Sequence, residues 1–454
     1  MIPIVTPQEM AAIDAAALEH VDVLVGRAGT AVARAARRML GGTYGRAVNV
    51  IAGPGNNGAD GRVAGQLLSS AGVTVRVFEA AGIPPSLPSA DLVLDAAYGT
   101  GFHGEWTAPM VDGARVLAVD IPSGVDGLTG RAVPGTMAAA ETVTFAALKP
   151  GLLLGDGKHV AGRITVADIG LDASSARAHA VDGADVRAWW RPRPAGAHKW
   201  SQAVRVVAGS PGMNGAASLA SLAAMRAGAG IVWLSTPGEA APRAELLEVV
   251  GRPCPDVGWA DDVTASLGRF GALVVGPGLG LEPRTVDEVR AVVDRAPCAT
   301  VVDGDGLTAI ATSPRGLESI LRARTAPTVL TPHDGEFERL AGAPPGPDRF
   351  DAARRLASRT GAVVLLKGPT TLVAEPGGLV RAIAAGDQRL ATAGTGDVLS
   401  GTIGALLAGG MAPFDAAAAG AWLHGTAAML QPAAGLVASD VAAPIPRAIG
   451  LVTT

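Results

Sequence analysis

Residues 48–60 read VNVIAGPGNNGAD, a short apolar run followed by glycines at positions 53, 55 and 58. The apolar run predicts a buried strand, and the glycines predict a tight turn that opens a helix. The spacing G-x-G-x-x-G is typical of a phosphate-binding turn, because unpaired backbone N–H groups and the helix dipole favour an anion there. On spacing alone the segment predicts a dinucleotide site; the alternative is a glycine turn needed only for packing.

The residues inside this turn argue against a dehydrogenase. Glu79 ends the next apolar run, where a Rossmann unit places the acid that binds a cofactor ribose, and this favours a nicotinamide cofactor. However, Asn56, Asn57 and Asp60 add amide and carboxylate oxygens where a pyrophosphate usually meets bare backbone. A carboxylate repels an anion, so a dehydrogenase becomes the weakest of the functional hypotheses.

Further oxygen atoms follow two later apolar runs. Asp95 lies in LDAAYGTG, and Asp120 and Ser123 lie in VDIPSG. Amide, carboxylate and hydroxyl oxygens without His or Cys suit a hard cation such as potassium or magnesium rather than zinc. The alternative is that both aspartates only cap turns.

The rest of the chain repeats the alternation of apolar runs and helical stretches, which predicts parallel sheets covered on both faces. The first set of runs includes ADLVLDAAYG, ARVLAVDIPSG, ETVTFAA and GRITVADIG. A proline-rich stretch, RPRPAGA, follows Trp190, and a second set then begins with AVRVVAGS and ends with AVVLLKGPTTLVA. We therefore predict an α/β protein with a Rossmann-like three-layer domain at 1–190, a linker at 191–199 and a second α/β domain at 200–454.

Composition limits the partners. The chain has 454 residues, a net charge of −4 and no concentrated basic block, so we expect small-molecule partners and neither nucleic acid nor a membrane. Cys254 and Cys298 are far apart, which favours structural thiols. The uncharged run 416–439 is rich in alanine and glycine and predicts a buried helix of a soluble protein. We expect no signal peptide, a cytoplasmic location and a homo-oligomer, although no motif specifies the oligomeric state.

Four separated motifs of the first domain resemble the NAD(P)H-hydrate epimerase domain over most of 1–190. They are NNGAD, DAAYGTGFHGE, DIPSGVDGLTG and the long segment ETVTFAALKPGLLLGDGKHVAGRITVADIG. The resemblance implies inversion at C6 of the hydrated nicotinamide ring, for which Asp120 is the candidate for proton transfer. It also implies a potassium ion on Asn57, Asp95 and Ser123. Ala59 stands where the family usually has glycine.

The same resemblance implies a set of residues that contact the hydrated dinucleotide. They are Asn56, Asn57, Gly58, Ala59, Asp60, Gly99, Thr100, Gly101, Phe102, His103, Gly104, Glu105 and Asp120.

The second domain contains LATAGTGD at 390–397, followed by a long apolar helical stretch. Glycines and threonines at a helix start expose N–H groups, and an acid beside such an anion hole suits phosphoryl transfer. Asp397 is then the general base that accepts the proton of an attacking hydroxyl. An ordinary helix cap is the alternative. No G-x-x-x-x-G-K-[ST] sequence occurs, which argues against a P-loop enzyme.

Residues 200–454 resemble the ADP-dependent NAD(P)H-hydrate dehydratases of the ribokinase-like superfamily. The motifs are GSPGMNGAASLA, GPGLG, LTPHDGEFERL, LKGPTT, LATAGTGD and ASDV, in that order. Two departures concern the nucleotide, ADP or ATP: Asp334 stands where proline is usual, and KGPTT replaces the commoner KGAGT.

The residues implied for this site fall into two groups. The hydrated dinucleotide would contact Ala216, Gly278, His333 and Asp397, although His333 is otherwise explained as a turn residue. The adenine nucleotide, accompanied by magnesium, would contact Lys367, Gly368, Pro369, Thr370, Thr371 and Gly396.

Together the two resemblances imply a bifunctional repair enzyme. The first domain would equilibrate the R and S hydrates of NADH and NADPH (NADHX and NADPHX), and the second would dehydrate the S form with ADP, giving AMP and phosphate. Two alternatives remain. One is a small-molecule kinase with an accessory domain, and the other is a first domain that only binds a ligand or partner.

Overall fold

The computed structural model describes residues 1–239 and 247–453, and the chain divides into two compact units. The N-terminal unit is Ile2–His179, and the C-terminal unit is Ala180–Thr454 together with Met1. Helix α5 (Gly183–Trp189) precedes the proline-rich stretch and packs against helices of the C-terminal unit. The domain limits 1–190 and 200–454, with a linker at 191–199, stay a prediction.

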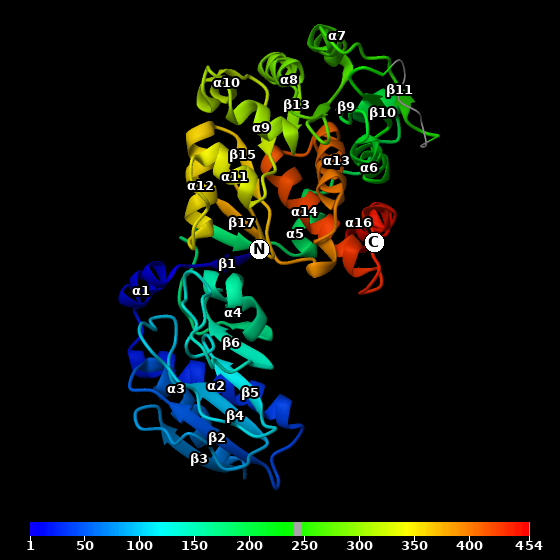
Figure 1. The fold of residues 1–454 in the computed structure, drawn as a ribbon. Helices are drawn as coiled ribbons and strands as arrows, with labels where there is room; N and C mark the ends of the chain where they lie inside the picture. The colour runs from blue at the N-terminus through cyan, green and yellow to red at the C-terminus, as the bar shows by residue number, and fades with distance from the viewer. Residues whose placement is uncertain (240–246, 454) are drawn as a thin grey trace. The chain divides into compact units, whose positions relative to one another are not determined.

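The N-terminal unit is built on a six-stranded parallel sheet (Figure 1). Its strands, in spatial order, are β3 (Thr74–Glu79), β2 (Ala47–Ala52), β4 (Leu92–Ala96), β5 (Arg115–Val119), β6 (Glu141–Phe145) and β7 (Arg163–Ala167). All five residues of β4 are buried. Near-continuous apolar strands require cover on both faces, and the unit provides it in two different ways.

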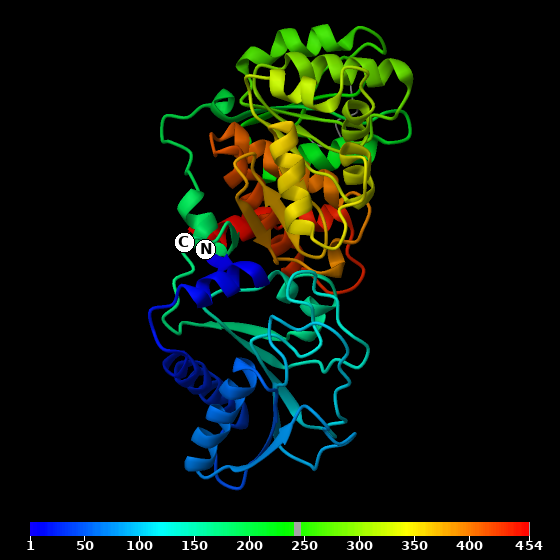
Figure 2. The same ribbon diagram turned by 90° about the vertical axis from the view of Figure 1, so that its left-hand side faces the viewer.

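Helices cover one face of this sheet and loop segments cover the other. Helices α2 (Val21–Leu40) and α3 (Asn56–Ser70) lie side by side on the strands (Figure 2), and their alanine-rich faces join β2, β4 and β5 in one apolar core. The opposite face is packed by apolar side chains of the segments that follow β3, β4 and β5, including Phe102 and Trp106. Two short helices, η1 (Pro150–Leu152) and α4 (Gly155–Val160), follow β6.

The turn after β2 demands its glycines. A Cβ on Gly53 would lie 1.8 Å from the carbonyl oxygen of Ala97, and a Cβ on Gly58 would lie 1.9 Å from the carbonyl oxygen of Gly53. No side chain can occupy either place, so the turn and the first turn of α3 approach each other as bare backbone. The predicted strand, glycine turn and helix are confirmed.

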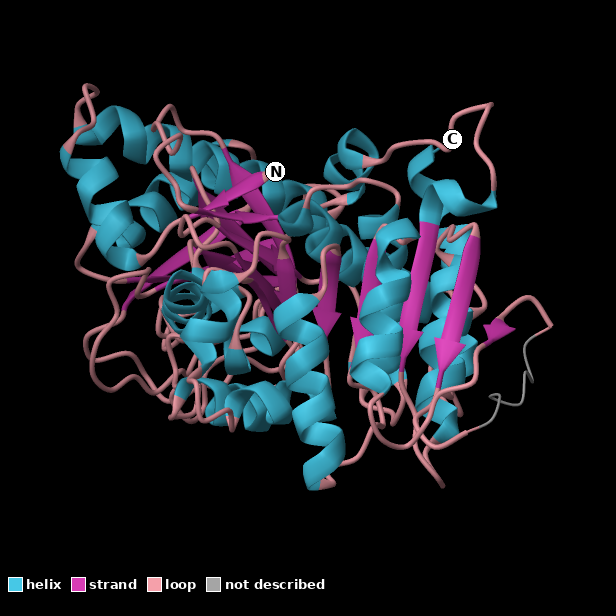
Figure 3. Cartoon of the chain, turned by 90° about the horizontal axis from the view of Figure 1, so that it is seen from above, coloured by secondary structure: helices cyan, strands magenta, loops and turns pink. Residues whose placement is uncertain are grey.

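The C-terminal unit has a larger, mostly parallel sheet (Figure 3). The strands of this sheet that lie wholly within the C-terminal unit are, in spatial order, β17 (Val380–Ile383), β16 (Thr371–Ala374), β15 (Val363–Leu366), β14 (Thr328–Leu330), β13 (Ala299–Val302), β12 (Ala272–Val275), β9 (Ala203–Val207), β10 (Ile231–Ser235) and β11 (Val250–Gly251). Only β16 and β17 of these run antiparallel to their neighbours. The predicted α/β class with parallel sheets is confirmed.

Two sets of helices cover this sheet. One core joins the sheet to α6 (Asn214–Arg226), α13 (Thr395–Ala408), α14 (Pro413–Met429), α15 (Ala438–Ala442) and α16 (Ile445–Thr453). A second set packs together as α7 (Trp259–Ser266), α8 (Pro283–Arg295), α9 (Asp305–Ala311), α10 (Leu317–Ala323), α11 (Asp334–Ala341) and α12 (Arg349–Thr360). The uncharged run 416–439 falls mainly in α14, whose alanines are buried. Across the described residues, no helix combines the length and apolarity needed to span a bilayer.

The two cysteines fit the structural interpretation. Cys254 and Cys298 are both buried and free. Burial raises the pKa of each thiol to about 11, so both stay protonated and unreactive near neutral pH.

Candidate active sites

The N-terminal unit contains a cavity of about 570 Å³ at the carboxyl ends of its strands, where open parallel sheets bind ligands. Much of its polar lining comes from the turn after β2, the turn after β4 and Asp120 directly after β5, and Asp14 and Lys149 add to it. The lining residues include Asp14, Asn56, Asn57, Asp60, Tyr98, Gly99, Thr100, Gly101, Phe102, Asp120 and Lys149.

Asp120 is held in an unusual conformation. Its φ is 67°, a left-handed value that non-glycine residues rarely adopt. The backbone N–H and hydroxyl of Thr100 donate to one carboxylate oxygen at 3.0 and 2.5 Å. The ammonium group of Lys149 and the hydroxyl of Thr144 donate to the other at 2.6 and 3.0 Å. Backbone strain and saturated hydrogen bonding at a cavity wall are the marks of a functional residue.

Lys149 is almost wholly buried, and its ammonium group forms three hydrogen bonds with nearby residues. Besides Asp120, its ammonium group donates to the hydroxyl of Thr144 at 2.8 Å and to the carbonyl of Phe145 at 3.1 Å. Burial alone would raise the pKa of Asp120, but the Lys149 charge and the Thr100 hydrogen bonds hold it below its ordinary value. Asp120 is therefore an oriented carboxylate that stays ionised.

Two other carboxyl groups of this cavity behave in the opposite way. Burial, with the nearby charges of Asp120 and Asp14, raises the pKa of Asp60 to about 8. Burial also raises the pKa of Asp14, opposed by Lys149 and reinforced by Asp120. Carboxyl groups with pKa values pushed apart in one cavity can act as base and acid.

Next to the cavity, three residues form a candidate cation site. Both polar atoms of the Asn57 amide and one carboxylate oxygen of Asp95 are buried without a hydrogen-bond partner in the described part of the chain. The other Asp95 oxygen accepts from the Ser123 backbone N–H at 2.9 Å. The Ser123 hydroxyl accepts from the backbone N–H of Tyr98 at 2.9 Å and donates to its carbonyl oxygen at 3.2 Å. Unpartnered buried oxygens are costly unless a ligand pairs them, so the donor set fits the potassium ion that the resemblance implies.

The structure brings together only part of the predicted epimerase set. Asn56, Asn57, Asp60, Gly99, Thr100, Gly101, Phe102 and Asp120 line the cavity. The side chains of His103 and Glu105 are exposed, and Gly58 and Ala59 lie in the first turn of α3 behind the lining residues. Glu79 forms an ion pair with Arg62, which also donates to the Gly53 carbonyl at 3.0 Å. Glu79, which the sequence suggested as a ribose-binding acid, thus pairs with the arginine that contacts the glycine turn.

Sequence reasoning missed Lys149, Thr144 and Asp14. Lys149 lies within the quoted segment ETVTFAALKPGLLLGDGKH, but nothing in its neighbours indicates that its side chain returns to Asp120. Asp14 belongs to α1 (Pro7–Ala15), far in sequence from the glycine turn. The one signal in the sequence was a lysine within an otherwise apolar run, which indicates an unusual position but not its partner.

The second site gathers at the N-terminus of α13. Gly394 is its N-cap with φ 89°, and the Thr395 hydroxyl turns inward to the Leu390 and Thr392 carbonyls at 2.8 and 2.9 Å. The first N–H groups of a helix have no intrahelical partner, so this terminus can accept an anion. Asp397 lies in the same first turn, and the GTGD prediction of an acid beside a helix start is confirmed as a local structure.

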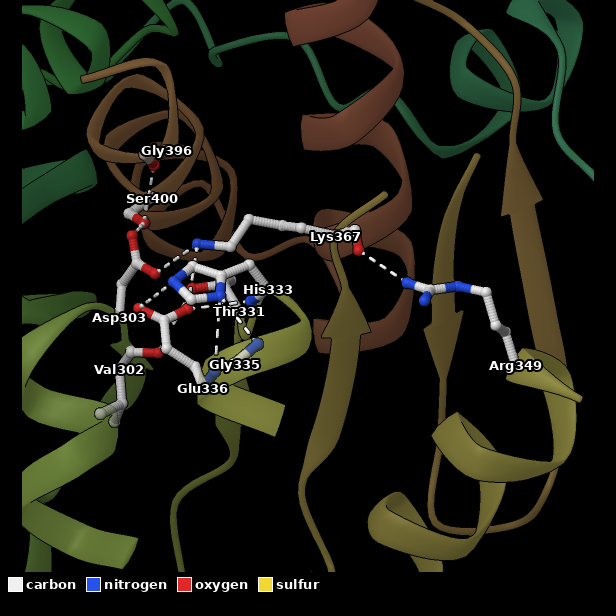
Figure 4. A network of polar contacts seen from close by, with 10 residues as sticks. All are labelled: Val302, Asp303, Thr331, His333, Gly335, Glu336, Arg349, Lys367, Gly396 and Ser400. Atoms are coloured by element: carbon white, nitrogen blue, oxygen red, sulfur yellow. Dashed lines mark hydrogen bonds and ion pairs between the residues drawn. The ribbon is translucent and has the colours of Figure 1, made fainter. Parts of the chain in front are cut away.

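Lys367 links this helix terminus to the strands beside it (Figure 4). Its ammonium group lies 2.9 Å from Asp303 and 3.6 Å from Glu336, and a Cβ on Gly396 would lie 3.5 Å from it. Asp303 also accepts from the Ser400 hydroxyl of α13 at 2.5 Å. Burial opposes the charge of Lys367, but the carboxylates raise its pKa above the ordinary value, so a fixed cation faces the anion site.

The pKa of the Asp397 carboxyl group is raised above its ordinary value. Burial, with the charge of Asp303, raises its pKa to about 7, while Lys367 acts in the opposite direction. A base whose pKa lies near the working pH combines a substantial ionised fraction with a real affinity for a proton.

His333 caps α11. Its ring Nδ1 accepts from the backbone N–H groups of Gly335 and Glu336 at 3.1 and 3.4 Å, and its backbone N–H donates to the Glu336 carboxylate at 2.9 Å. The side chain remains more than half exposed, so the cap and ligand contact are compatible. Ala216 and Gly278 adjoin each other, since a Cβ on Gly278 would lie 3.0 Å from that of Ala216. The ligand contacts of all three residues stay predictions.

One buried residue near this site carries no sequence signal. His424 of α14 packs beneath the GTGD turn, where it forms a hydrogen bond with the backbone of Thr395. Burial lowers its pKa to about 4, so the ring stays neutral. The alanine-rich helix around it gave no reason to single it out.

Two α/β units, each with acidic side chains gathered beyond its parallel strands, define a two-site α/β enzyme. Residues 204–447 match the family described as NAD(P)H-hydrate dehydratase, and residues 21–91 and 81–151 match the family described as YjeF-related protein N-terminus. The chain belongs to the family of bifunctional NAD(P)H-hydrate repair enzymes.

Curated relatives support this assignment over nearly the full length. The bifunctional NAD(P)H-hydrate repair enzyme Nnr of Mycobacterium tuberculosis is 39% identical over 416 residues, which cover 86% of this chain and 84% of that protein. The proteins of the same name from Salinibacter ruber and Escherichia coli are each 34% identical, covering 98% and 88% of this chain and 96% and 84% of their own lengths.

Solved structures support the C-terminal fold. The ADP/ATP-dependent NAD(P)H-hydrate dehydratase of Bacillus subtilis, co-crystallised with ATP and Mg²⁺, is 31% identical with a TM-score of 0.52, covering 60% of this chain and 97% of that one. A ribokinase-like superfamily protein of Enterococcus faecalis, at 20% identity and a TM-score of 0.54, covers 61% of this chain and 96% of that one and shows the fold alone. The predicted ribokinase-like fold is confirmed.

Proposed function

We propose that this chain repairs hydrated nicotinamide nucleotides at two sites: the N-terminal unit interconverts the R and S hydrates of NADH and NADPH, and the C-terminal unit dehydrates the S form with ADP. The observation that carries the proposal is the pairing of Asp397, a base with a pKa of about 7, with a helix terminus and a fixed Lys367. Family membership supplies the substrate class.

In the C-terminal site, Asp397 accepts the proton of the ring hydroxyl as that oxygen attacks the terminal phosphorus of ADP, and AMP leaves. The N-terminus of α13 and Lys367 stabilise the transferred phosphoryl group. The phosphorylated oxygen is then a good leaving group: phosphate departs from C6, a proton leaves C5, and the dihydropyridine is restored. ADP and the hydrate thus give AMP, phosphate and NAD(P)H.

Magnesium would accompany the nucleotide phosphates. Within the described residues no cluster of three or more His, Cys, Asp or Glu side chains could hold a metal alone. Magnesium commonly binds through substrate phosphates and one or two carboxylates, and Asp303 and Glu336 are the acidic groups beside Lys367. The metal would neutralise charge on the phosphates.

In the N-terminal site, Asp120 is the ionised group placed to move a proton as C6 inverts, by ring opening or by loss and return of hydroxide. Asn57, Asp95 and Ser123 would hold a potassium ion, which supplies positive charge near the negative substrate. The glycine turns position the ring and the phosphates through backbone N–H groups. A homo-oligomeric state and a cytoplasmic location stay predictions.

The test is recovery of the dihydropyridine absorbance from a mixture of both hydrates with ADP, magnesium and saturating protein. We expect full recovery. A plateau at the S fraction, beyond slow spontaneous epimerisation, would exclude the epimerase role. A stable phosphorylated product without NADH would instead identify a small-molecule kinase.

A further inference from the structure

Arg349, the first residue of α12, joins two segments that the proposed dehydratase site uses. Figure 4 shows its contact with Lys367. Its two terminal nitrogens donate to the two carboxylate oxygens of Asp334 at 2.9 and 2.8 Å. One of them also donates to the carbonyl oxygen of Lys367 at 2.9 Å. Asp334 begins α11 directly after the His333 cap, so one guanidinium group connects the start of α11 to the segment after β15.

The connection fixes Lys367 from both ends. Its ammonium group is held by Asp303, and its backbone carbonyl is held by Arg349. The next residue, Gly368, lies against the guanidinium, since a Cβ there would be 3.0 Å from its nearest nitrogen. The backbone that leads into Pro369 therefore has its position set by the Arg349 side chain.

Arg349 is suited to this role because it is largely buried while its carboxylate partner is exposed. The exposed fractions of the two side chains are 16% and 60%. The Nε atom of Arg349 is buried without a hydrogen-bond partner in the described residues, so its terminal nitrogens carry its hydrogen bonds. A planar fork can bind both carboxylate oxygens and a carbonyl at once, which a lysine cannot.

We propose that the Asp334–Arg349 pair is a positioning element for the adenine nucleotide, which holds the backbone of residues 367–371 in the shape that binds a nucleoside diphosphate. This inference rests on the proposed function, and on the sequence resemblance, which implies that residues 367–371 contact the adenine nucleotide. Arg349 acts through the Lys367 carbonyl rather than on the reacting atoms. Because Asp303 holds the Lys367 ammonium group independently of Arg349, loss of Arg349 should weaken nucleotide binding and leave the chemical step intact.

The experiment combines calorimetric titration of the full chain with ADP and magnesium and steady-state dehydration of the S hydrate. The variants are R349A, R349K and D334N. R355A is the matched control, because Arg355 lies on the same helix, forms an ion pair with Asp351 and has a side chain that is 70% exposed. Thermal unfolding of each variant checks that it is folded.

For R349A we expect the Kd and KM for ADP to rise about tenfold, from loss of a charged hydrogen bond, with kcat at saturating ADP unchanged. D334N should raise the Kd about twofold, as for an exposed ion pair, and R349K should lie between wild type and R349A. R355A should bind ADP like wild type.

Three results would overturn the inference, and they are distinguishable. If wild type binds ADP and folded R349A binds it equally well, the positioning role is wrong and the proposed function stands. If wild type itself binds no ADP, the proposed function fails and the inference falls with it. A fall in kcat with unchanged KM would also contradict a positioning role.

Discussion

At the scale of single residues, the N-terminal cavity depends on a lysine that fixes the state of an aspartate. Lys149 is 1% exposed and donates to Asp120 at 2.6 Å. In Lys149→Met the carboxylate would keep its burial and lose its compensating charge, so the pKa of Asp120 should rise above its ordinary value. We expect the free energy of unfolding to fall by ~3 kcal/mol at pH 7 and epimerisation to be lost.

The loss of stability in Lys149→Met should depend on pH in a defined direction. In wild type the folded pKa of Asp120 lies below its unfolded value, so its stabilisation is present above about pH 4 and disappears as the pH falls further. Denaturant unfolding of both proteins between pH 3 and 7 should therefore show a gap that narrows on acidification. The exposed Lys199→Met variant is the control. A gap that is constant with pH would mean that Lys149 contributes only packing.

Asp397 should control the pH profile of dehydration. Its pKa of about 7 means that the ionised fraction falls tenfold for each pH unit below that value. We expect kcat/KM to follow the same slope and to level off above about pH 7, since kcat/KM reports groups of the free enzyme. Asp397→Asn should abolish turnover. A variant that stayed active would exclude Asp397 as the essential base.

The stability of the Asp397 variant provides a second check. The folded pKa is raised above the unfolded value, so ionising this carboxyl costs stability as the pH rises from about 4 to about 7. Asp397→Asn should therefore be more stable than wild type at pH 8, and the difference should shrink toward pH 4. Such behaviour separates a destabilised functional residue from an ordinary helix cap, whose removal would lower stability at every pH.

At the scale of elements, the start of α3 depends on one glycine. Gly58→Ala would place a methyl group 1.9 Å from the Gly53 carbonyl oxygen, so α3 or the turn must move. We expect a loss of ~1–3 kcal/mol in the free energy of unfolding, and weaker binding at the cavity. Gly55→Ala is the control, because a Cβ on Gly55 meets nothing within 4 Å. Equal stability of the two variants in urea titrations would contradict the packing argument.

The elements also show what a sequence can predict. Alternating apolar runs identified the strands, and because parallel strands end at one edge, they placed Asp120 and Asn57 in one neighbourhood. The periodicity of apolar residues does not indicate which distant residue a long side chain contacts. Three long-range contacts are therefore visible only in the tertiary structure. They are the hydrogen bond from Lys149 to Asp120, the hydrogen bond from Arg349 to the Lys367 carbonyl, and the ion pair of Arg62 with Glu79. His333 had two compatible roles, and only the capping role is visible in the backbone contacts.

At the scale of the whole molecule, the residues described for each site come from one unit. The cavity around Asp120 is lined by residues of Ile2–His179, and the Asp397 network is drawn from Ala180–Thr454. Among the described residues, the contacts given for either site include no side chain of the other unit. Inactivating one site should therefore leave the chemistry of the other unchanged.

This independence predicts complementation between two inactive proteins. Asp120→Asn alone should recover only the S fraction of a hydrate mixture, and Asp397→Asn alone should recover nothing. An equimolar mixture of the two variants should recover both hydrates, because a hydrate inverted at one chain can diffuse to the dehydratase site of another. The end point should match wild type, with a lag that shortens as protein concentration rises. A mixture that stops at the S fraction, while Asp397→Asn still interconverts the two hydrates, would mean that the inverted hydrate does not reach a site on another chain.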